Sequence, residues 1–340
     1  MKTLSATVFV TDEKIDALRA ALDAGADPAR SAWPDVLRTA EDGLDRAPHA
    51  PDHWMVPWYY VQPEEHNRLK NVLRDDANTA YAQALAFRVT GERRFADAAL
   101  RLLDGWVEGV DTMSREEDST LSFSNLFPAF VFAADLLRDQ GVWEEERRER
   151  FTRFLRERAL PMNCMEKENN WGNWGMLLVA VCGAYLHDAD LLESCAERWT
   201  FMIDTQIAED GHMPREVDRN EGRHGVWYSH FALLPQTLVA EVLRVNGTDL
   251  FDYASPEGRT LRLACERLLP WIEDPASFPN WKGPAEELVR PDYYSYFEIL
   301  RARWPDFPAD DLLRRDRPMT AEHSAPFLTF THGVPLENEA

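Results

Sequence analysis

Two stretches of the chain gather side chains that do chemistry rather than fill a core. The first, residues 210–230, reads DGHMPREVDRNEGRHGVWYSH and combines three arginines and three histidines with Glu216 and Tyr228 among few aliphatic residues. The second, residues 168–175, reads ENNWGNWG and places three amides and two indoles at the expected start of a helix. Guanidinium and amide groups bind carboxylates, and indole rings offer flat stacking surfaces. Together the two stretches predict a cleft for an acidic polysaccharide.

Tyr228 is the expected acid and base of this cleft. Tyrosine has an ordinary pKa of about 10, so a tyrosine that acts as a base at neutral pH needs positive neighbours that stabilise its phenolate. Arg219, Arg223, His224 or His230 could supply that charge. Glu216 could orient an arginine, and the alternative interpretation of the arginines is an ordinary solvated face.

Asn170 is the expected partner of a substrate carboxylate. An amide NH2 group directed at that carboxylate would neutralise it and make the neighbouring proton easier to remove, as an oxyanion hole does. The alternative is that Asn169 and Asn170 only cap a helix that begins near Trp171. Three amides exceed what one cap needs. The other residues expected to contact substrate are Tyr59, Tyr60, Trp171, Asn173, Trp174, Glu216, Arg223, Arg290, Tyr294 and Tyr296.

Composition limits the possible ligands. The 340 residues are 45% hydrophobic, which is ample for a core, and the formal net charge of -22 argues against general binding of nucleic acid or an anionic membrane. An anionic ligand therefore needs a local positive pocket. The four cysteines are scattered and predict buried free thiols, and no metal or cofactor motif appears. The first residues make a poor signal peptide, so we expect a cytoplasmic protein as written, or a secreted one if a signal was removed.

Apolar residues recur at helical spacing along most of the chain and predict an all-α fold. The first expected helical hairpin covers residues 75–109 and turns at Thr90 and Gly91. Three more expected hairpins pair residues 122–137 with 144–160, 174–186 with 189–207, and 228–245 with 259–272. A last helix is expected at 294–303. The hairpins differ in length and alternate with irregular loops. This favours a closed, incomplete α/α toroid over a regular solenoid, although the first hairpin resembles a tetratricopeptide turn.

We expect one toroidal domain over residues 1–340, with an irregular tail at 305–340. Four prolines surround Trp54, Trp58, Tyr59 and Tyr60 in the loop at 48–66. Aromatic side chains on a loop fixed by prolines indicate either a lid over a sugar cleft or ordinary packing under a long loop.

Several segments occur in the order that is typical of one family. They read VPWYYVQP, the hairpin at 76–106, NNWG, DGHMPREVDR and YSHFAL. From about residue 56 to 306 the chain resembles the alginate lyase superfamily of α/α toroids. The resemblance implies that Asn170 binds the substrate carboxylate, that Arg219 helps neutralise it and that Tyr228 is the catalytic acid and base.

The chain departs from the family pattern at two points. Trp171 stands where the family has a histidine, and the spacing from Arg219 to Tyr228 is about two residues longer. His224 or His230 could take over the role of the histidine. Tyr294 or Tyr296 could replace Tyr228. The chain therefore resembles a divergent branch of the superfamily.

The resemblance implies a metal-independent lyase that breaks a 1,4-linked polyuronate by β-elimination. In mannuronate and glucuronate the C5 hydrogen and O4 lie on the same side of the ring, so one tyrosine can serve as base and then as acid. In guluronate they lie on opposite sides, and a second group such as His230 would be needed. Polymannuronate is the first expected substrate and glucuronan the second. The competing classes are a noncatalytic helical scaffold and a toroidal hydrolase with paired carboxylates.

Overall fold

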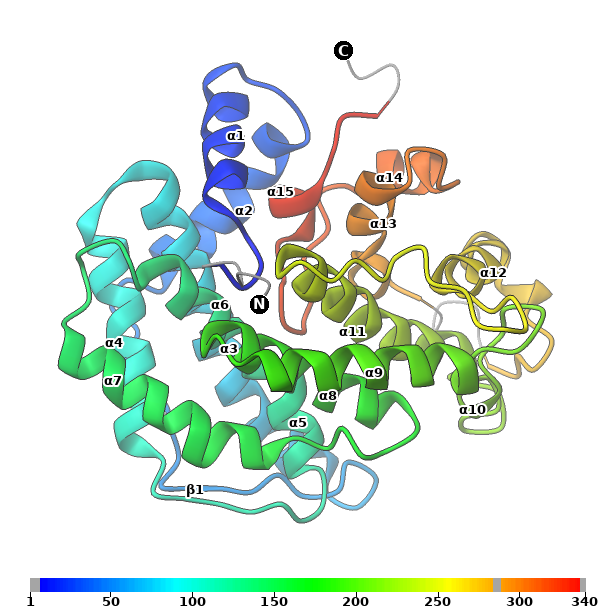
Figure 1. The fold of residues 1–340 in the computed structure, drawn as a ribbon, viewed down its shortest axis with the longest axis horizontal. Helices are drawn as coiled ribbons and strands as arrows, with labels where there is room; N and C mark the ends of the chain where they lie inside the picture. The colour runs from blue at the N-terminus through cyan, green and yellow to red at the C-terminus, as the bar shows by residue number, and fades with distance from the viewer. Residues whose placement is uncertain (1–6, 284–288, 337–340) are drawn as a thin grey trace.

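The computed structural model describes residues 7–283 and 289–336. In these ranges the regular secondary structure is almost all helical, which confirms the predicted class (Figure 1). The α-helices are α1 (Asp12–Asp23), α2 (Ala29–Asp42), α3 (Pro63–Thr90), α4 (Arg93–Gly109), α5 (Ser119–Leu126), α6 (Pro128–Leu137), α7 (Glu145–Phe154), α8 (Asn170–Tyr185), α9 (Ala189–Gln206), α10 (Pro214–Val217), α11 (Gly225–Val245), α12 (Leu261–Glu273), α13 (Phe297–Arg303), α14 (Asp310–Asp316) and α15 (Leu328–His332).

Short elements connect these helices. A π-helical turn η1 (Leu155–Ala159) and a 3₁₀ turn η2 (Leu160–Met162) extend α7, and the 3₁₀ turns η3 (Pro275–Ser277) and η5 (Pro291–Tyr294) precede α13. Two strands, β1 (His53–Trp54) and β2 (Thr112–Met113), form a parallel pair.

Local sequence explains where several helices begin and end. The Thr11 side chain accepts a hydrogen bond from the Lys14 amide and caps α1, as its position predicts. The Asn169 side chain caps α8 in the same way by accepting from the Trp171 amide. The long helix α3 ends at Gly91, whose φ of 75° is the left-handed conformation that glycine adopts without strain. The predicted hairpin of α3 and α4 is thereby confirmed.

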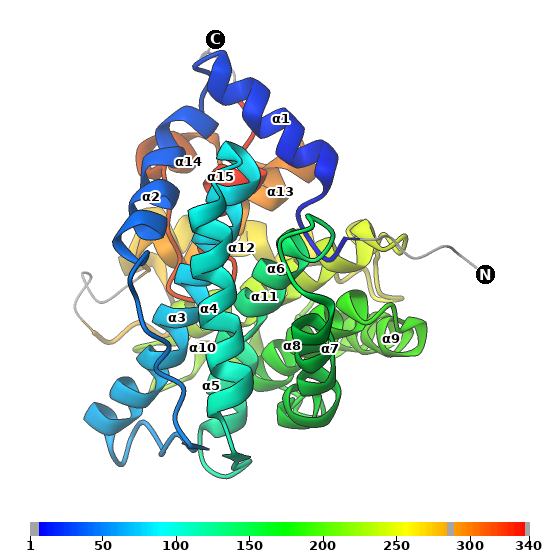
Figure 2. The ribbon, with the colours of Figure 1, turned by 90° about the vertical axis from the view of Figure 1, so that its left-hand side faces the viewer.

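The inner helices pack in a ring. Each helix of the ring contacts the next in the order α3, α6, α8, α11, α13, α15 and α2, and α2 contacts α3 to close the ring. A second layer lies outside, where α4 packs on α3, α9 on α8 and α12 on α11. Figure 2 shows the same layering from the side. This is the predicted α/α toroid.

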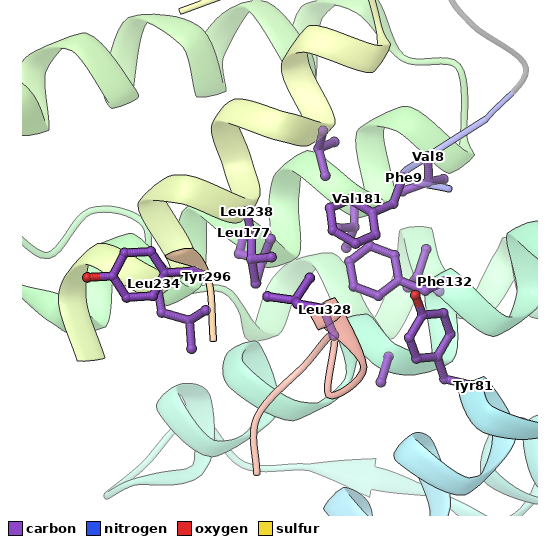
Figure 3. Close-up of a cluster of buried hydrophobic side chains, with 14 of the residues drawn as sticks. Val8, Phe9, Tyr81, Phe132, Leu177, Val181, Leu234, Leu238, Tyr296 and Leu328 are labelled. Atoms are coloured by element: carbon purple, nitrogen blue, oxygen red, sulfur yellow. The ribbon is translucent and has the colours of Figure 1, made fainter. Parts of the chain in front are cut away.

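The core fills the centre of the ring with side chains from both ends of the chain (Figure 3). Phe9, just before α1, stacks on Phe132 of α6 with ring centroids 4.7 Å apart. The Val8 amide donates a hydrogen bond of 2.8 Å to Asp135, another residue of α6, whose side chain is 3% exposed. Leu328 of α15 is fully buried in this core. The N-terminal segment and α15 therefore close the middle of the toroid.

Within residues 305–336 the tail is irregular except for the two short helices α14 and α15, and α15 is buried. One apolar stretch, Ser119–Leu137, has the length and composition of a membrane span with a mean hydropathy of 1.4, but 89% of it is buried inside the structure. It supplies α5 and α6 to the core of the ring.

Candidate active site

The residues expected to do chemistry meet where α8 and α11 begin. Asn170 is the first residue of α8, and Tyr228 lies in the first turn of α11. The short helix α10 and the turn after it lie between them in sequence, and α10 packs against α11. Because the N-terminal end of a helix carries partial positive charge, this arrangement favours an anionic ligand.

An exposed aromatic loop covers this end of the ring. We call residues 57–62 the aromatic loop. Its backbone is held by acidic residues before α5, because the Trp58 amide donates to Glu117 at 2.7 Å and the Tyr59 amide to Asp118 at 2.8 Å. Trp58 and Tyr60 remain 46% and 73% exposed. These rings do not pack into the core, whereas Trp54 of the predicted loop at 48–66 is 1% exposed and packs against Trp106 and Phe123.

The aromatic loop contacts both predicted halves of the site. The Tyr60 hydroxyl lies 3.0 Å from the Tyr228 hydroxyl. The Trp58 ring lies 6.0 Å from that of Trp171, the residue that stands in place of the family's histidine. Trp171 is half-buried. Two indoles and two phenols therefore lie close together at the predicted site.

A buried carboxylate joins the two expected carboxylate-binding groups. Glu216 is 1% exposed. One of its oxygens, Oε1, accepts from the Asn170 backbone amide at 3.0 Å, and both oxygens lie 3.0–3.1 Å from the Asn170 Nδ2. The Arg219 Nε lies 3.4 Å from Oε2, which makes an ion pair rather than a well-aligned hydrogen bond. Burial raises the pKa of Glu216, while Arg219 and the Asn170 donors act in the opposite direction.

This arrangement corrects two expectations. Glu216 was expected to contact substrate, but it is buried and binds Asn170 and Arg219 instead. The Asn170 NH2 group was expected to point at a substrate carboxylate, but it points at Glu216. The Asn170 Oδ1 atom is buried and has no hydrogen-bond partner in the described part of the chain.

A tight turn compensates for the longer spacing between Arg219 and Tyr228. Asn220, Glu221 and Gly222 all have positive φ angles, of 51°, 58° and 84°. A Cβ atom on Gly222 would lie 1.8 Å from the Asn280 carbonyl oxygen, so only glycine fits there. The turn coils the extra residues locally. As a result the Arg219 guanidinium carbon lies 5.2 Å from the centre of the Tyr228 ring.

The environment of Tyr228 does not lower its pKa as predicted. Burial raises that pKa above its ordinary value, and the neighbouring Tyr60 hydroxyl raises it further. The charge of Arg219 lowers the pKa of Tyr228, but by less than burial and Tyr60 raise it. The phenol of Tyr228 is therefore protonated at neutral pH in the unliganded protein.

The other expected charged residues are arranged unevenly around the site. The His224 ring centroid lies 6.5 Å from that of Tyr228, so this histidine is next to the site. Arg223 is exposed on the same turn. Arg290 is exposed, packs over the Tyr293 ring at 5.2 Å and pairs with Asp292 and Glu322. Tyr293 in turn lies 5.4 Å from the Trp227 ring, and Trp227 contacts Tyr228, so aromatic neighbours connect Arg290 to the site.

Five expected site residues belong to the core instead. Asn173, Trp174, His230, Tyr294 and Tyr296 are at most 1% exposed. Asn173 donates to Gln206 and to the Ala232 carbonyl oxygen, and Tyr294 donates to Asp316. His230 Nδ1 lies 3.0 Å from the Tyr296 hydroxyl, and Tyr296 lies among buried leucines (Figure 3). Burial lowers the pKa of His230 to about 3. His230 is therefore not a second base in the cleft.

Two features of the site were not predicted. Glu117 and Asp118 hold the aromatic loop, and the only sequence signal for them is a pair of acidic residues before a helix. Trp58 was counted in the lid but not among the substrate-binding residues. In the described ranges, no group of three or more histidine, cysteine or acidic side chains could hold a metal ion.

A helical toroid that groups a tyrosine, an arginine and an asparagine around one buried carboxylate is built like a polysaccharide lyase. The sequence profile of the family described as "Alginate lyase" matches residues 26–278, and the chain belongs to that family.

Individual relatives are distant. A protein named polysaccharide lyase from Stenotrophomonas maltophilia is 30% identical over 174 residues, which cover 51% of this chain and 50% of that protein. An alginate lyase from Pseudomonas syringae pv. tomato is 26% identical over 131 residues, which cover 38% of this chain and 32% of that protein. The chain thus matches about half of the length of these relatives or less.

Solved structures show the same fold along nearly the whole chain. A histidine-to-alanine variant of alginate lyase A1-III, complexed with a tetrasaccharide, superposes with a TM-score of 0.81 at 20% identity and covers 97% of this chain and 96% of that one. An alginate lyase from Bacteroides ovatus superposes with a TM-score of 0.74 at 16% identity, over 96% and 99% of the two chains.

Proposed function

We propose that the protein is a lyase that cleaves a 1,4-linked polyuronate by β-elimination, with polymannuronate as its preferred substrate. The observation that carries this proposal is the position of Arg219, which packs over the Tyr228 ring and pairs with the same carboxylate that binds Asn170. A tyrosine beside two carboxylate-binding groups suits the removal of a proton next to a carboxylate. The names of the similar proteins agree with this chemistry.

The reaction follows from these positions. The substrate carboxylate binds the Arg219 guanidinium, which stabilises the negative charge that develops when the C5 proton leaves. Tyr228 takes that proton, the C4–O4 bond breaks and a C4=C5 double bond forms. The proton then passes from Tyr228 to O4. No water is added, and the new chain end is an unsaturated uronate.

Tyr228 first gives its own proton to solvent, because its phenol is protonated in the unliganded site and only the phenolate can accept the C5 proton. Arg219 stabilises the phenolate from the ring face. The Tyr60 hydroxyl is the nearest group that can donate a hydrogen bond to the phenolate oxygen. General acid–base catalysis of this kind typically contributes about 10²–10⁴-fold in rate.

The preference for mannuronate rests on the burial of His230. His230, the expected second base, is buried behind the site. One tyrosine can remove the C5 proton and protonate O4 only when both lie on the same side of the ring. Mannuronate and glucuronate have that arrangement, and guluronate does not. Glucuronan is therefore the alternative substrate.

The test is to incubate the protein with polymannuronate, polyguluronate and glucuronan and to follow the ultraviolet absorbance of unsaturated uronates. We expect the absorbance to rise fastest with polymannuronate and not with polyguluronate. New reducing ends without this absorbance would indicate a hydrolase, and binding without cleavage would indicate a scaffold. Either result would reject the proposal.

A further inference from the structure

The hydrogen bonds around Glu216 leave one buried atom unsatisfied. The two oxygens of one carboxylate lie close together, whereas the two N–H bonds of an amide point far apart. One N–H group of the Asn170 Nδ2 is therefore shared between both Glu216 oxygens. The Asn170 Oδ1 atom is buried without a partner in the described part of the chain. A buried acceptor in this state typically costs about 1–3 kcal/mol. The unliganded arrangement is therefore not the best one that these two side chains can make.

A single proton allows a better arrangement. If Glu216 is protonated, its hydroxyl can donate to the Asn170 Oδ1 once the amide has rotated by half a turn about its last bond. The other Glu216 oxygen still accepts from the Asn170 backbone amide, as it does in the present structure. The NH2 group of Asn170 then takes the place of Oδ1, which is buried in the unliganded protein, so a ligand carboxylate reaches it only by displacing the groups that cover this atom. All the polar atoms of the pair keep or gain a partner when a ligand carboxylate accepts from that NH2 group.

Charge favours the same change. Among the described residues, Glu216 is the only carboxylate that pairs with Arg219, so an ionised Glu216 cancels the charge that a substrate carboxylate needs. A second carboxylate beside Arg219 would also repel Glu216. Like charges that share one site disfavour the doubly ionised state.

We propose that Glu216 takes up a proton from solvent when the uronate carboxylate binds, and that this proton turns the Asn170 amide toward the substrate and releases Arg219. Glu216 is thus a positioning residue that acts through Asn170 and Arg219. The inference rests on the proposed function of the site.

The polar groups that face Glu216 come from three elements, and among the described residues Arg219 is the charged one. Asn170 faces Glu216 from α8, Arg219 from the turn after α10, and Tyr228 from α11. Arg215, its neighbour on α10, pairs with Glu168 through exposed side chains. Burial already raises the pKa of Glu216 in the unliganded protein, so the cost of protonation is reduced.

The first experiment measures proton uptake during binding. The inactive variant Tyr228→Phe is titrated with oligomannuronate in a calorimeter, at one pH above neutrality and in two buffers of different ionisation enthalpy. We expect uptake of about one proton for each oligosaccharide bound, and an affinity that weakens about tenfold for each pH unit. Binding without proton uptake would overturn the inference while leaving the lyase proposal intact.

The second experiment replaces Glu216 by its neutral isostere. In Glu216→Gln, the new NH2 group can donate to the Asn170 Oδ1 permanently and the new oxygen can accept from the backbone amide. We expect this variant to keep more turnover than Glu216→Ala, to bind in the Tyr228→Phe background without proton uptake, and to have an affinity that no longer depends on pH. Loss of turnover equal to that of Glu216→Ala, in a protein that remains folded by circular dichroism, would show that the ionised carboxylate is required and would overturn the inference.

The matched control is Glu168→Gln. Glu168 also joins the segment before α8 to α10, through its ion pair with Arg215 at 2.8 Å, but it is exposed and does not contact Asn170 or Arg219. The variant Glu168→Gln should leave the proton uptake on oligomannuronate binding unchanged. If oligomannuronate and oligoglucuronate both fail to bind, and the wild-type chain cleaves neither polymer, the proposed function fails and this inference fails with it.

Discussion

The contact between the Tyr60 and Tyr228 hydroxyls allows the acid/base and the group that assists it to be tested separately. Each hydroxyl can be removed alone, by Tyr228→Phe or Tyr60→Phe, with almost no change in volume. The two oxygens lie 3.0 Å apart, and Tyr60 is 73% exposed, so little of the fold depends on this bond. Both variants should therefore remain folded, which circular dichroism can check.

The expected losses differ in size. Tyr228→Phe removes the group that accepts and returns the proton, so kcat on oligomannuronate should fall by about 10²–10⁴-fold. Tyr60→Phe removes one hydrogen bond to the phenolate oxygen. A net hydrogen bond of about 0.5–1.5 kcal/mol corresponds to a loss in kcat of roughly twofold to tenfold. Binding of oligomannuronate by Tyr228→Phe should persist, because Arg219 and Asn170 remain.

The double variant tests whether Tyr60 acts through Tyr228. If the Tyr60 hydroxyl only assists ionisation of Tyr228, its removal should cost nothing further in the Tyr228→Phe background. A full additional loss would mean that Tyr60 contacts the reacting atoms itself. Tyr228→Phe with wild-type turnover would refute the assignment of Tyr228 and with it the mechanism.

Three further predictions concern other parts of the molecule. Asn170→Ala should lower kcat by about 10²-fold or more, the scale for losing one oxyanion-type donor, and unchanged steady-state kinetics would remove Asn170 from the mechanism. Treatment with a chelator should leave turnover intact, and activity that returned only with a divalent ion would contradict the tyrosine mechanism. Tyr296→Phe should lower the free energy of unfolding by about 1 kcal/mol, since its hydroxyl binds His230 in the core, and should leave kcat/KM unchanged. Loss of turnover without loss of stability in a denaturant titration would return Tyr296 to the list of acid/base candidates.

Most of the fold could be predicted because its helices are long. The periodic segments predicted at 75–109 and 228–245 correspond to α3, α4 and α11, and their boundaries differ by a few residues except at the start of α3, which begins at Pro63. The C-terminal helices α14 and α15 were missed. They have seven and five residues, which is too short for a helical pattern to be seen and too short for a helix to be stable alone. Their formation depends on burial in the ring, and local sequence does not report that.

The expected site residues lie at different depths in the structure, which their types did not predict. Asn170 and Trp174 share one face of α8, but Trp174 lies one turn further along the helix, inside the ring. Tyr228 and His230 are two residues apart and so point to different sides of α11, one to the aromatic loop and the other to the core. A pattern of residue types gives the face of a helix, whereas the packing of neighbouring helices decides which end of that face is open.

The pKa of Tyr228 shows why nearness in sequence is a poor measure of charge. Four positive or potentially positive residues lie within ten positions of it, and from their number alone the pKa was expected to fall. In the structure one of them, Arg219, lies over the ring, and Glu216 already pairs with it, while burial raises the pKa. Positive charge therefore has to become available to the substrate and the phenolate during binding. Protonation of Glu216 releases that charge without moving the backbone, and it does so only when a carboxylate is present to use it.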